Sequence, residues 1–435
     1  MKKIQILVLF VSSLLAFSSQ AAVKIEHWQT QSGARVYFVE NHDLPIVDLS
    51  VNFAAGGARD TTEKSGVAGI TRYMMTLGAA GLSDETLTNK FADVGAVLGG
   101  DFDADRSSLK LRTLSSAPEQ TQALDTFKKI LHQPDFPPAV LTREKARIIA
   151  GIQESETQPE SISNKAFMSA LYGQHPYARD ESGTVASVTA INAQDLKKFY
   201  QQHYGANGAV IAMMGDLTRE QASKIANELA AGLPKTSAPT PLPAVTLPIA
   251  ENTQKIAHPA SQSHILIGYP GIKRIDPDYF ALYVGNYILG GGGFVSRLTE
   301  EVREKRGLVY SVYSYFMPMQ ELGPFQIGLQ TKKEQAGEAL KVVHETLDKF
   351  MQNGVTEKEL QAAKDNIIGG FPMRIDSNGK ILDYISMIGF YQLPLTYLED
   401  YNKKVNAVTT AQIKEAFNRR IDTKKLVTVI VGSQN

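Results

Sequence analysis

Positions 69, 72 and 73 of one predicted helix carry the residue types on which the interpretation of this chain depends. Their i, i+3, i+4 spacing places Gly69, Arg72 and Tyr73 on one helical face. A face with this spacing binds a metal ion when it carries imidazoles and carboxylates. Glycine offers no ligand atom, a phenol ordinarily stays protonated up to a pKa of about 10, and a guanidinium repels a cation. The face as it stands therefore predicts no metal site.

The same segment, expected to be helical over residues 65–77, also reads as an ordinary amphipathic helix. Val67, Ile70, Met74 and Leu77 recur at helical spacing, which is the pattern of a core-facing stripe. The two interpretations are compatible, because a helix face without metal ligands can still pack against a core.

Arg303 and Tyr310 are a second group of residues whose types could take part in catalysis. A guanidinium and a phenol are hydrogen-bond donors, and donors aimed at a tetrahedral oxyanion lower the barrier to peptide hydrolysis. By pattern alone, however, Arg303 belongs to a charged helix over 300–306 and Tyr310 to an alternating strand over 308–316. The pattern by itself favours that structural interpretation.

Histidine spacing gives no support to a zinc site elsewhere. No two histidines form a His-x-x-x-His, His-x-x-Glu-His or His-x-His pair, and the sequence contains no cysteine. The eight positions are His27, His42, His132, His175, His203, His258, His264 and His344.

The segment 66–73 resembles the inverted zinc motif of the M16 family of peptidases, which includes pitrilysin and the mitochondrial processing peptidase. That motif is written Gly-x-Ala-His-x-x-Glu-His, and Gly66 and Ala68 fit its frame. The histidine positions hold Gly69 and Tyr73, and the glutamate position, the general base in an active enzyme, holds Arg72. The resemblance implies an M16 chain that performs no zinc chemistry alone.

The resemblance also implies a third ligand, a glutamate in a downstream helix. By spacing, the equivalent position falls at Ala150 or Gly151, and neither binds metal. Glu144 and Glu154 lie nearby but out of register. We therefore expect no cofactor in this chain.

The segment 302–310 is similar to the M16 C-terminal signature, Leu-Arg-x-x-x-Gly-Leu-x-Tyr, with Val302 in place of leucine. The resemblance implies that Arg303 and Tyr310 face a zinc site and bind substrate in the transition state. Just upstream lies a run of four glycines, Gly290, Gly291, Gly292 and Gly293. It resembles a glycine-rich segment that contacts incoming peptide in M16 subunits, although it also suits a helix cap and turn.

The N-terminus predicts export. Lys2 and Lys3 precede an apolar stretch over 4–17, and Ser19-Gln20-Ala21 is a small-x-small cleavage site. We expect cleavage near Ala21 and a periplasmic or secreted mature chain with no membrane span. Lys+Arg and Asp+Glu both total 45, so no overall field attracts nucleic acid.

The mature chain is predicted to contain two copies of one α+β domain. A helix-then-strand pattern after Val188 recurs after Val405, and an earlier strand-then-helix pattern recurs at nearly the same offset. A proline-rich stretch divides the copies. We expect a signal peptide (1–21), an N-terminal M16 domain (22–233), a linker (234–250) and a C-terminal M16 domain (251–435), each an antiparallel-rich sheet covered by helices.

The resemblance implies a division of labour. A homologous partner carrying His-x-x-Glu-His would supply zinc, this chain would supply Arg303 and Tyr310, and a peptide or unfolded polypeptide would be cut between them. The alternative is a catalytically inert peptide-binding or assembly protein of the same fold.

Overall fold

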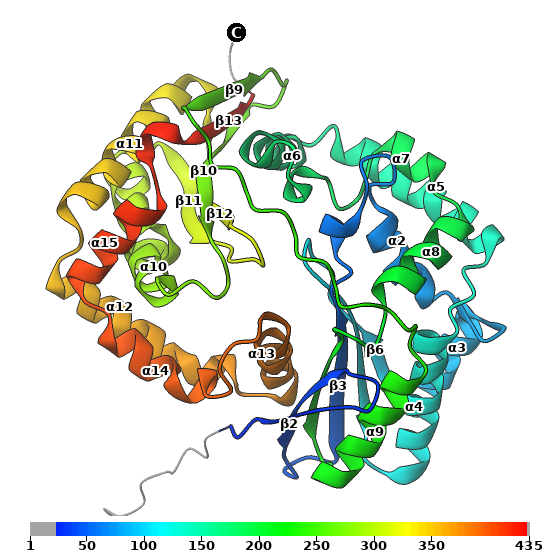
Figure 1. Cartoon of the computed structure of the whole chain (residues 1–435). Coiled ribbons are helices and arrows are strands. Elements are labelled where there is room, and N and C mark those ends of the chain that lie inside the picture. Colours follow the sequence, from blue (N-terminus) through cyan, green and yellow to red (C-terminus); the bar gives the residue numbers. More distant parts are fainter. Residues whose placement is uncertain (1–22, 433–435) are drawn as a thin grey trace, which may run out of the picture.

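The computed structural model describes residues 23–432, and the predicted signal peptide lies outside them. The chain forms two halves, each a sheet with helices on its outer side (Figure 1). The α+β prediction, with a sheet in each half, is confirmed. No helix within these residues is both long and apolar enough to cross a lipid bilayer.

The first sheet has six strands in the order β1-β2-β8-β3-β7-β6, antiparallel except for the parallel β2–β8 pair. Its strands are β1 (Glu26–Gln29), β2 (Arg35–Glu40), β3 (Ile46–Phe53), β6 (Val97–Gly99), β7 (Ser107–Leu114) and β8 (Val210–Gly215), with β4 (Gly78–Ala79) and β5 (Leu82–Ser83) pairing separately. β8 is buried along its whole length, so both faces of the central strands are covered.

The second sheet has five strands in the order β11-β12-β10-β13-β9, antiparallel except for β13–β9. Its strands are β9 (Asn252–Ile256), β10 (Gln262–Ile272), β11 (Val309–Phe316), β12 (Gly323–Lys332) and β13 (Val427–Val431). This order repeats that of β6-β7-β3-β8-β2, which agrees with the predicted duplication.

The helices of the first half are α2 (Val67–Met75), α3 (Asp84–Ala92), α4 (Ala117–His132), α5 (Pro138–Ser155), α6 (Pro159–Tyr172), α7 (Val185–Ala190), α8 (Ala193–His203) and α9 (Arg219–Ala231). Those of the second are α10 (Tyr279–Asn286), α11 (Ala336–Asn353), α12 (Glu357–Gly370), α13 (Asn378–Tyr391), α14 (Tyr397–Ala407) and α15 (Thr410–Arg420). The charged helix expected over 300–306 is instead a π-helical turn, η5 (Thr299–Glu304).

Two helices are exchanged between the halves. α6, from the first half, packs on β10 and β13, whereas α13, from the second half, packs on β2, β3 and β8 (Figure 1). Each helix ends in a tyrosine that reaches across: the Tyr172 hydroxyl donates to the Leu322 carbonyl (3.0 Å) and the Tyr391 hydroxyl donates to Asp105 Oδ2 (3.0 Å). The two halves are thereby held together by more than the linker.

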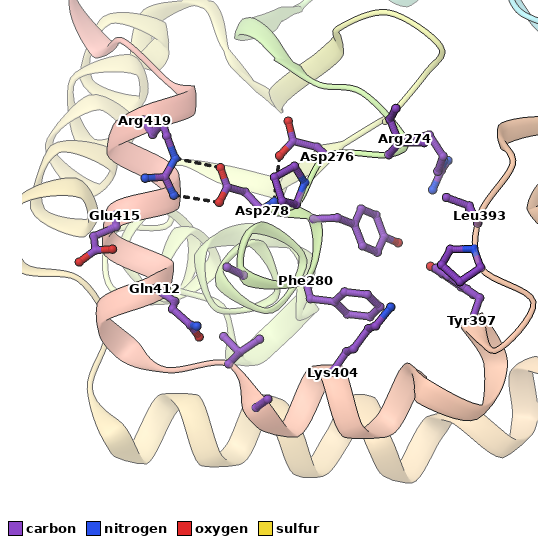
Figure 2. Close-up of a pocket in the computed structure, with 17 residues that line it drawn as sticks. Arg274, Asp276, Asp278, Phe280, Leu393, Tyr397, Lys404, Gln412, Glu415 and Arg419 are labelled. Carbon is purple, nitrogen blue, oxygen red and sulfur yellow. Dashed lines mark hydrogen bonds and ion pairs between the residues drawn. The ribbon is translucent and has the colours of Figure 1, made fainter.

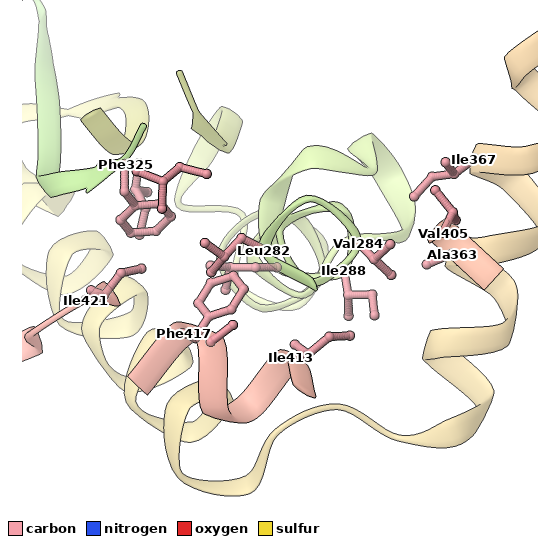
Figure 3. Packing of buried hydrophobic residues seen from close by; sticks show 14 of the residues in the cluster. Leu282, Val284, Ile288, Phe325, Ala363, Ile367, Val405, Ile413, Phe417 and Ile421 are labelled. Carbon is pink, nitrogen blue, oxygen red and sulfur yellow. The ribbon is translucent and has the colours of Figure 1, made fainter. Parts of the chain in front are cut away.

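The core of the second half centres on Phe417 of α15 (Figure 3). Its ring centroid lies 4.7 Å from that of Phe350 and 5.6 Å from that of Phe316. A Cβ at Gly285 of α10 would lie 2.5 Å from the Phe417 ring, so the close approach of α10 and α15 requires glycine there.

Residues 234–250 form neither helix nor strand and run along the first half. Arg59 donates to the Thr240 carbonyl at 2.6 Å, and His175 Nε2 lies 2.8 Å from the Pro243 carbonyl. The segment is therefore anchored, and the domain boundaries assigned to it stay a prediction.

Candidate functional site

The helix that carries positions 69, 72 and 73 begins at a residue only glycine suits. Gly66 has φ +94°, and a Cβ there would lie 3.0 Å from the Ser182 carbonyl. Asp60 caps the helix, because its carboxylate accepts the Gly66 and Ala68 amides at 2.6 and 2.9 Å. Burial raises the pKa of Asp60 to about 7, against the opposing effect of these amides.

An aromatic ring covers Gly69. A Cβ on Gly69 would contact the Phe102 ring at 3.4 and 3.5 Å, and the Glu181 carbonyl at 3.6 Å. Phe102 packs against the apolar core of the first half. A histidine at position 69 would therefore have to displace this ring before it could reach a metal.

Tyr73 is bonded to a glutamate. Its hydroxyl donates to Glu144 Oε2 at 3.3 Å, and Glu144 also accepts from Arg143 (2.7 Å) and Arg147 (2.9 Å). Burial alone would raise the pKa of this carboxyl, but the two arginines and the tyrosine bring it below its usual range. Glu144 thus stays ionised, and both of its carboxylate oxygens accept hydrogen bonds.

Arg72 turns toward the sheet. Its Nε donates to the Ser108 carbonyl of β7 at 3.2 Å, and its Nη2 would lie 2.6 Å from a Cβ at Gly100. A fixed positive charge thus occupies the place where the resemblance puts a general base. A metal-bound water needs a general base at this place to accept its proton, and a guanidinium cannot accept one.

The residues present do not fit zinc. Ala150 and Gly151, the positions predicted for a third ligand, are exposed on α5 and carry no donor atom. Within residues 23–432, no three His, Asp or Glu side chains are grouped so as to hold a metal ion. The α2 face is a packed and hydrogen-bonded surface.

The structure places the side chains of Arg303 and Tyr310 close together. The Arg303 guanidinium carbon lies 5.3 Å from the Tyr310 ring centroid and 4.9 Å from that of Phe294, so it makes cation–π contacts with two aromatic rings. Its nearest carboxylate oxygen is Glu304 Oε1, at 3.4 Å from Nε. Phe294 was not singled out by sequence reasoning, since an isolated phenylalanine after glycines carries no motif.

Tyr310 lies at a β-bulge on β11, an edge strand. The pairing with β12 passes from Val309↔Thr331 to Ser311↔Gln330, which leaves Tyr310 as the extra residue. The bulge turns its side chain outward, and Tyr310 is 82% exposed. Arg303 comes from η5, a π-helical turn, and such turns are frequent at functional sites.

The four glycines have packing reasons of their own. A Cβ at Gly290 would lie 2.4 Å from Ser314 Oγ, one at Gly291 2.7 Å from Asn286, and one at Gly292 2.7 Å from the Tyr287 carbonyl. Gly293, with φ +60°, has open space beside it. Gly290 is buried, whereas Gly291 and Gly293 are exposed.

The two groups lie in different halves. α2 packs on α8, β7 and η1 (Gly57–Arg59), whereas η5 packs on β11, α11 and the turn η4 (Gly293–Val295). The fold and site therefore define a two-domain peptidase-like scaffold whose metal face is filled and whose arginine–tyrosine pair is open to solvent.

Comparisons with known proteins give the same class. The model for insulinase (peptidase family M16) matches residues 35–185, and that for the peptidase M16 inactive domain matches residues 190–367. The crystal structure of a peptidase M16 inactive domain from Pseudomonas fluorescens superimposes with a TM-score of 0.91 at 39% identity, covering 94% of this chain and 98% of that one. The chain belongs to the M16 peptidase family and is an inactive-type member.

Two curated relatives carry different names. A non-peptidase homolog from Helicobacter pylori is 25% identical over 98% of both chains. An uncharacterized zinc protease from Streptomyces coelicolor is 30% identical over 56% of this chain, and the match spans 54% of that protein.

Proposed function

We propose that this chain is the metal-free subunit of a heteromeric M16 peptidase. In this proposal a zinc-bearing homologue, with an intact His-x-x-Glu-His helix, supplies the metal and the general base. This chain supplies Arg303 and Tyr310 to the bound peptide. The observation that carries the proposal is their geometry: an exposed tyrosine at a bulge beside a guanidinium in contact with two aromatic rings.

The chemistry follows from the residue types. A tyrosine hydroxyl donates to the oxyanion that forms when water attacks a peptide carbonyl. A guanidinium offers several donors in a fixed plane, which suits a peptide carbonyl or carboxylate. Cation–π contacts with Phe294 and Tyr310 favour this position of the Arg303 side chain.

The test is hydrolysis by the reconstituted pair. The partner is isolated by co-purification with this chain, and cleavage of a quenched fluorescent peptide is measured for each subunit and for both with zinc. We expect no cleavage by this chain alone. We expect Tyr310→Phe and Arg303→Ala each to lower kcat of the pair by about 10²–10³-fold.

Two neighbouring residues give matched controls. Tyr313→Phe removes a hydroxyl three residues along the same strand, and Arg306→Ala removes a guanidinium already bound to Glu301. Both variants should retain full activity. Cleavage by the isolated subunit, or full activity of the Arg303 and Tyr310 variants in the pair, would refute the proposal.

A second candidate function is a peptide-binding or assembly subunit that cuts nothing, in line with the filled metal face. It predicts a stable complex whose other members cleave peptide equally well without this chain. We also propose a periplasmic location after cleavage near Ala21, which N-terminal sequencing of the mature chain from a periplasmic extract tests.

A further inference from the structure

A cavity of about 520 Å³ lies where the two halves meet. The first half contributes Asp103, Asp105 and Arg106, and the second contributes the β11–β12 connection and residues in and before α13. None of the residues at the filled metal face lines it, nor do Arg303 and Tyr310. Its volume falls in the range of about 300–1,000 Å³ typical of ligand sites.

Methionine dominates the apolar part of the lining. The four side chains are Met317, Met319, Met373 and Met387, out of 11 methionines in the sequence. Met317 is 46% exposed and Met373 is 66% exposed, so apolar surface is left in contact with water at the mouth. Methionine is flexible and polarizable, and it suits surfaces that accept varied apolar side chains.

The cavity also holds a guanidinium that has no carboxylate partner among residues 23–432. Arg274 lies over the rings of Tyr391 (5.4 Å) and Tyr279 (5.9 Å), and its Nε is buried with no hydrogen-bond partner. The acids that follow it in sequence are bound by other arginines: Asp278 by Arg419 and Arg420, and Asp276 by Arg420. Figure 2, which draws a neighbouring pocket that also includes Arg274, shows the two bonds from Arg419 to Asp278.

The carboxylates that line the cavity are already bound. Asp103 pairs with Arg106 and Asp383 with Lys110. Asp105 accepts from Tyr177 (2.5 Å), the Gln320 amide (2.7 Å) and Tyr391 (3.0 Å). Arg374 is a second guanidinium in the lining, and it lies 6.0 Å from the Tyr283 ring centroid. The lining has four cationic side chains, Arg106, Arg274, Arg374 and Lys380, against the three carboxylates Asp103, Asp105 and Asp383, so its formal net charge is +1.

We propose that this cavity binds the C-terminal end of a peptide, with the terminal carboxylate at Arg274 and an apolar last side chain among the methionines. A peptide terminus with an apolar last residue presents both features at once: one anionic group and an adjacent apolar group of variable shape. A guanidinium binds a carboxylate through two parallel bonds, which fixes the direction of the chain. The inference rests on the proposed peptide-binding role but needs no zinc-bearing partner.

The test is fluorescence anisotropy with the mature chain alone. The probes are two dye-labelled peptides of the same sequence ending in leucine, one with a free C-terminal carboxylate and one with a C-terminal amide. We expect the carboxylate peptide to bind at least about tenfold more tightly. Arg274→Gln should abolish this preference by weakening only the carboxylate peptide, and Met373→Gln should weaken both peptides.

Matched controls lie far from the cavity. Arg219→Gln changes an arginine that also stacks on an aromatic ring, that of Trp28, and Ile249→Gln changes an exposed apolar residue of the linker. Neither should affect binding. Equal affinity for the two peptides, or an unchanged preference in Arg274→Gln, would overturn the inference. So would laurate displacing the probe more strongly than unlabelled carboxylate peptide, since the site would then be one for fatty acids.

The outcomes are separable from those of the hydrolysis test. If the carboxylate preference is absent while cleavage by the pair still depends on Arg303, only this inference fails. If the preference is present and the pair cleaves nothing, only the catalytic proposal fails.

Discussion

Glu144 joins α5 to α2 through the hydroxyl of Tyr73, and it is only 1% exposed. A buried carboxylate stabilises the fold only while its hydrogen-bond donors remain in place. Glu144 therefore depends on the particular donors that surround it on the filled metal face. Arg143 and Arg147 reach it from the solvent side. This arrangement makes Glu144 the most informative residue to change there.

We expect Glu144→Ala to lower the free energy of unfolding by about 1–3 kcal/mol, because the Tyr73 hydroxyl and both arginines lose their acceptor. The pKa of Glu144 is lowered in the folded chain, so its stabilisation is present above the ordinary value of 4.5 and is lost as pH falls through the folded pKa. Urea unfolding at pH 7 and pH 3 measures both. Glu154→Ala, ten residues further along α5, is the control.

The pKa of Asp60 is shifted in the opposite direction to that of Glu144. Burial raises its pKa from 3.8 to about 7, so the folded chain holds the proton more tightly than the unfolded chain does. Its contribution is fully present below pH 3.8 and is lost as pH rises through about 7. We expect Asp60→Asn to cost about 1–2 kcal/mol at pH 4, through the weakened cap, and less at pH 8. Parallel pH profiles for the two proteins would contradict this.

Single positions were partly predictable. The types at 69, 72 and 73 were enough to predict that this face offers no zinc ligands, because ligand chemistry depends on the residue itself. The contact between Tyr73 and Glu144 was not, since it joins two helices whose relative register no local pattern encodes. Phe294 beside Arg303 was missed because an isolated phenylalanine carries no motif.

At the scale of elements, the exchanged helix α13 depends on one glycine. A Cβ at Gly389 would lie 2.6 Å from Val210 of β8 and 2.7 Å from the Tyr37 ring of β2. Both neighbours are buried, so neither has free space into which to move. The Gly389 carbonyl also accepts from Arg35 at 2.9 Å.

We expect Gly389→Ala to destabilise the protein by about 1–3 kcal/mol and to loosen α13 from the first sheet. Gly369→Ala, in α12 with no atom near its Cβ, is the matched control and should be neutral or stabilising by about 0.5–1 kcal/mol. Chemical unfolding gives the energies, and faster proteolysis within α13 reports its release. Equal effects at the two positions would show that the contact is unimportant.

Sequence periodicity predicted the types of the elements more accurately than the positions of their ends. The helix over 193–203 has the predicted bounds, whereas that over 65–77 is shorter, because Gly66 and Asp60 fix its start. The exchange of α6 and α13 was not predictable. An apolar stripe shows that a helix packs on something, but not which of two similar sheets it covers.

At the scale of the whole molecule, Asp105 is the junction of the two halves. It lies in the first half and accepts bonds from Gln320 and Tyr391 of the second, as well as from Tyr177. Removing it leaves three donors without an acceptor at a buried interface. The exchanged helices and this junction together predict that the two halves unfold as one unit.

We expect one calorimetric transition for the wild type and two for Asp105→Ala, as the halves lose their coupling. Asp125→Ala, on the surface of α4, should keep one transition. A single transition with an unchanged midpoint in Asp105→Ala would show that the exchanged helices couple the halves without this carboxylate.

The exchange of helices has a consequence for how the protein is made. While the polypeptide leaves the ribosome, the first sheet is complete once β8 has emerged, but Tyr37, Val39 and Val210 stay bare until α13 is synthesised. During that interval the nascent chain exposes an apolar face of the first sheet to solvent. Fragments ending after α9 should therefore aggregate or recruit chaperones, and a stop codon before α13 should be far more harmful than one after it.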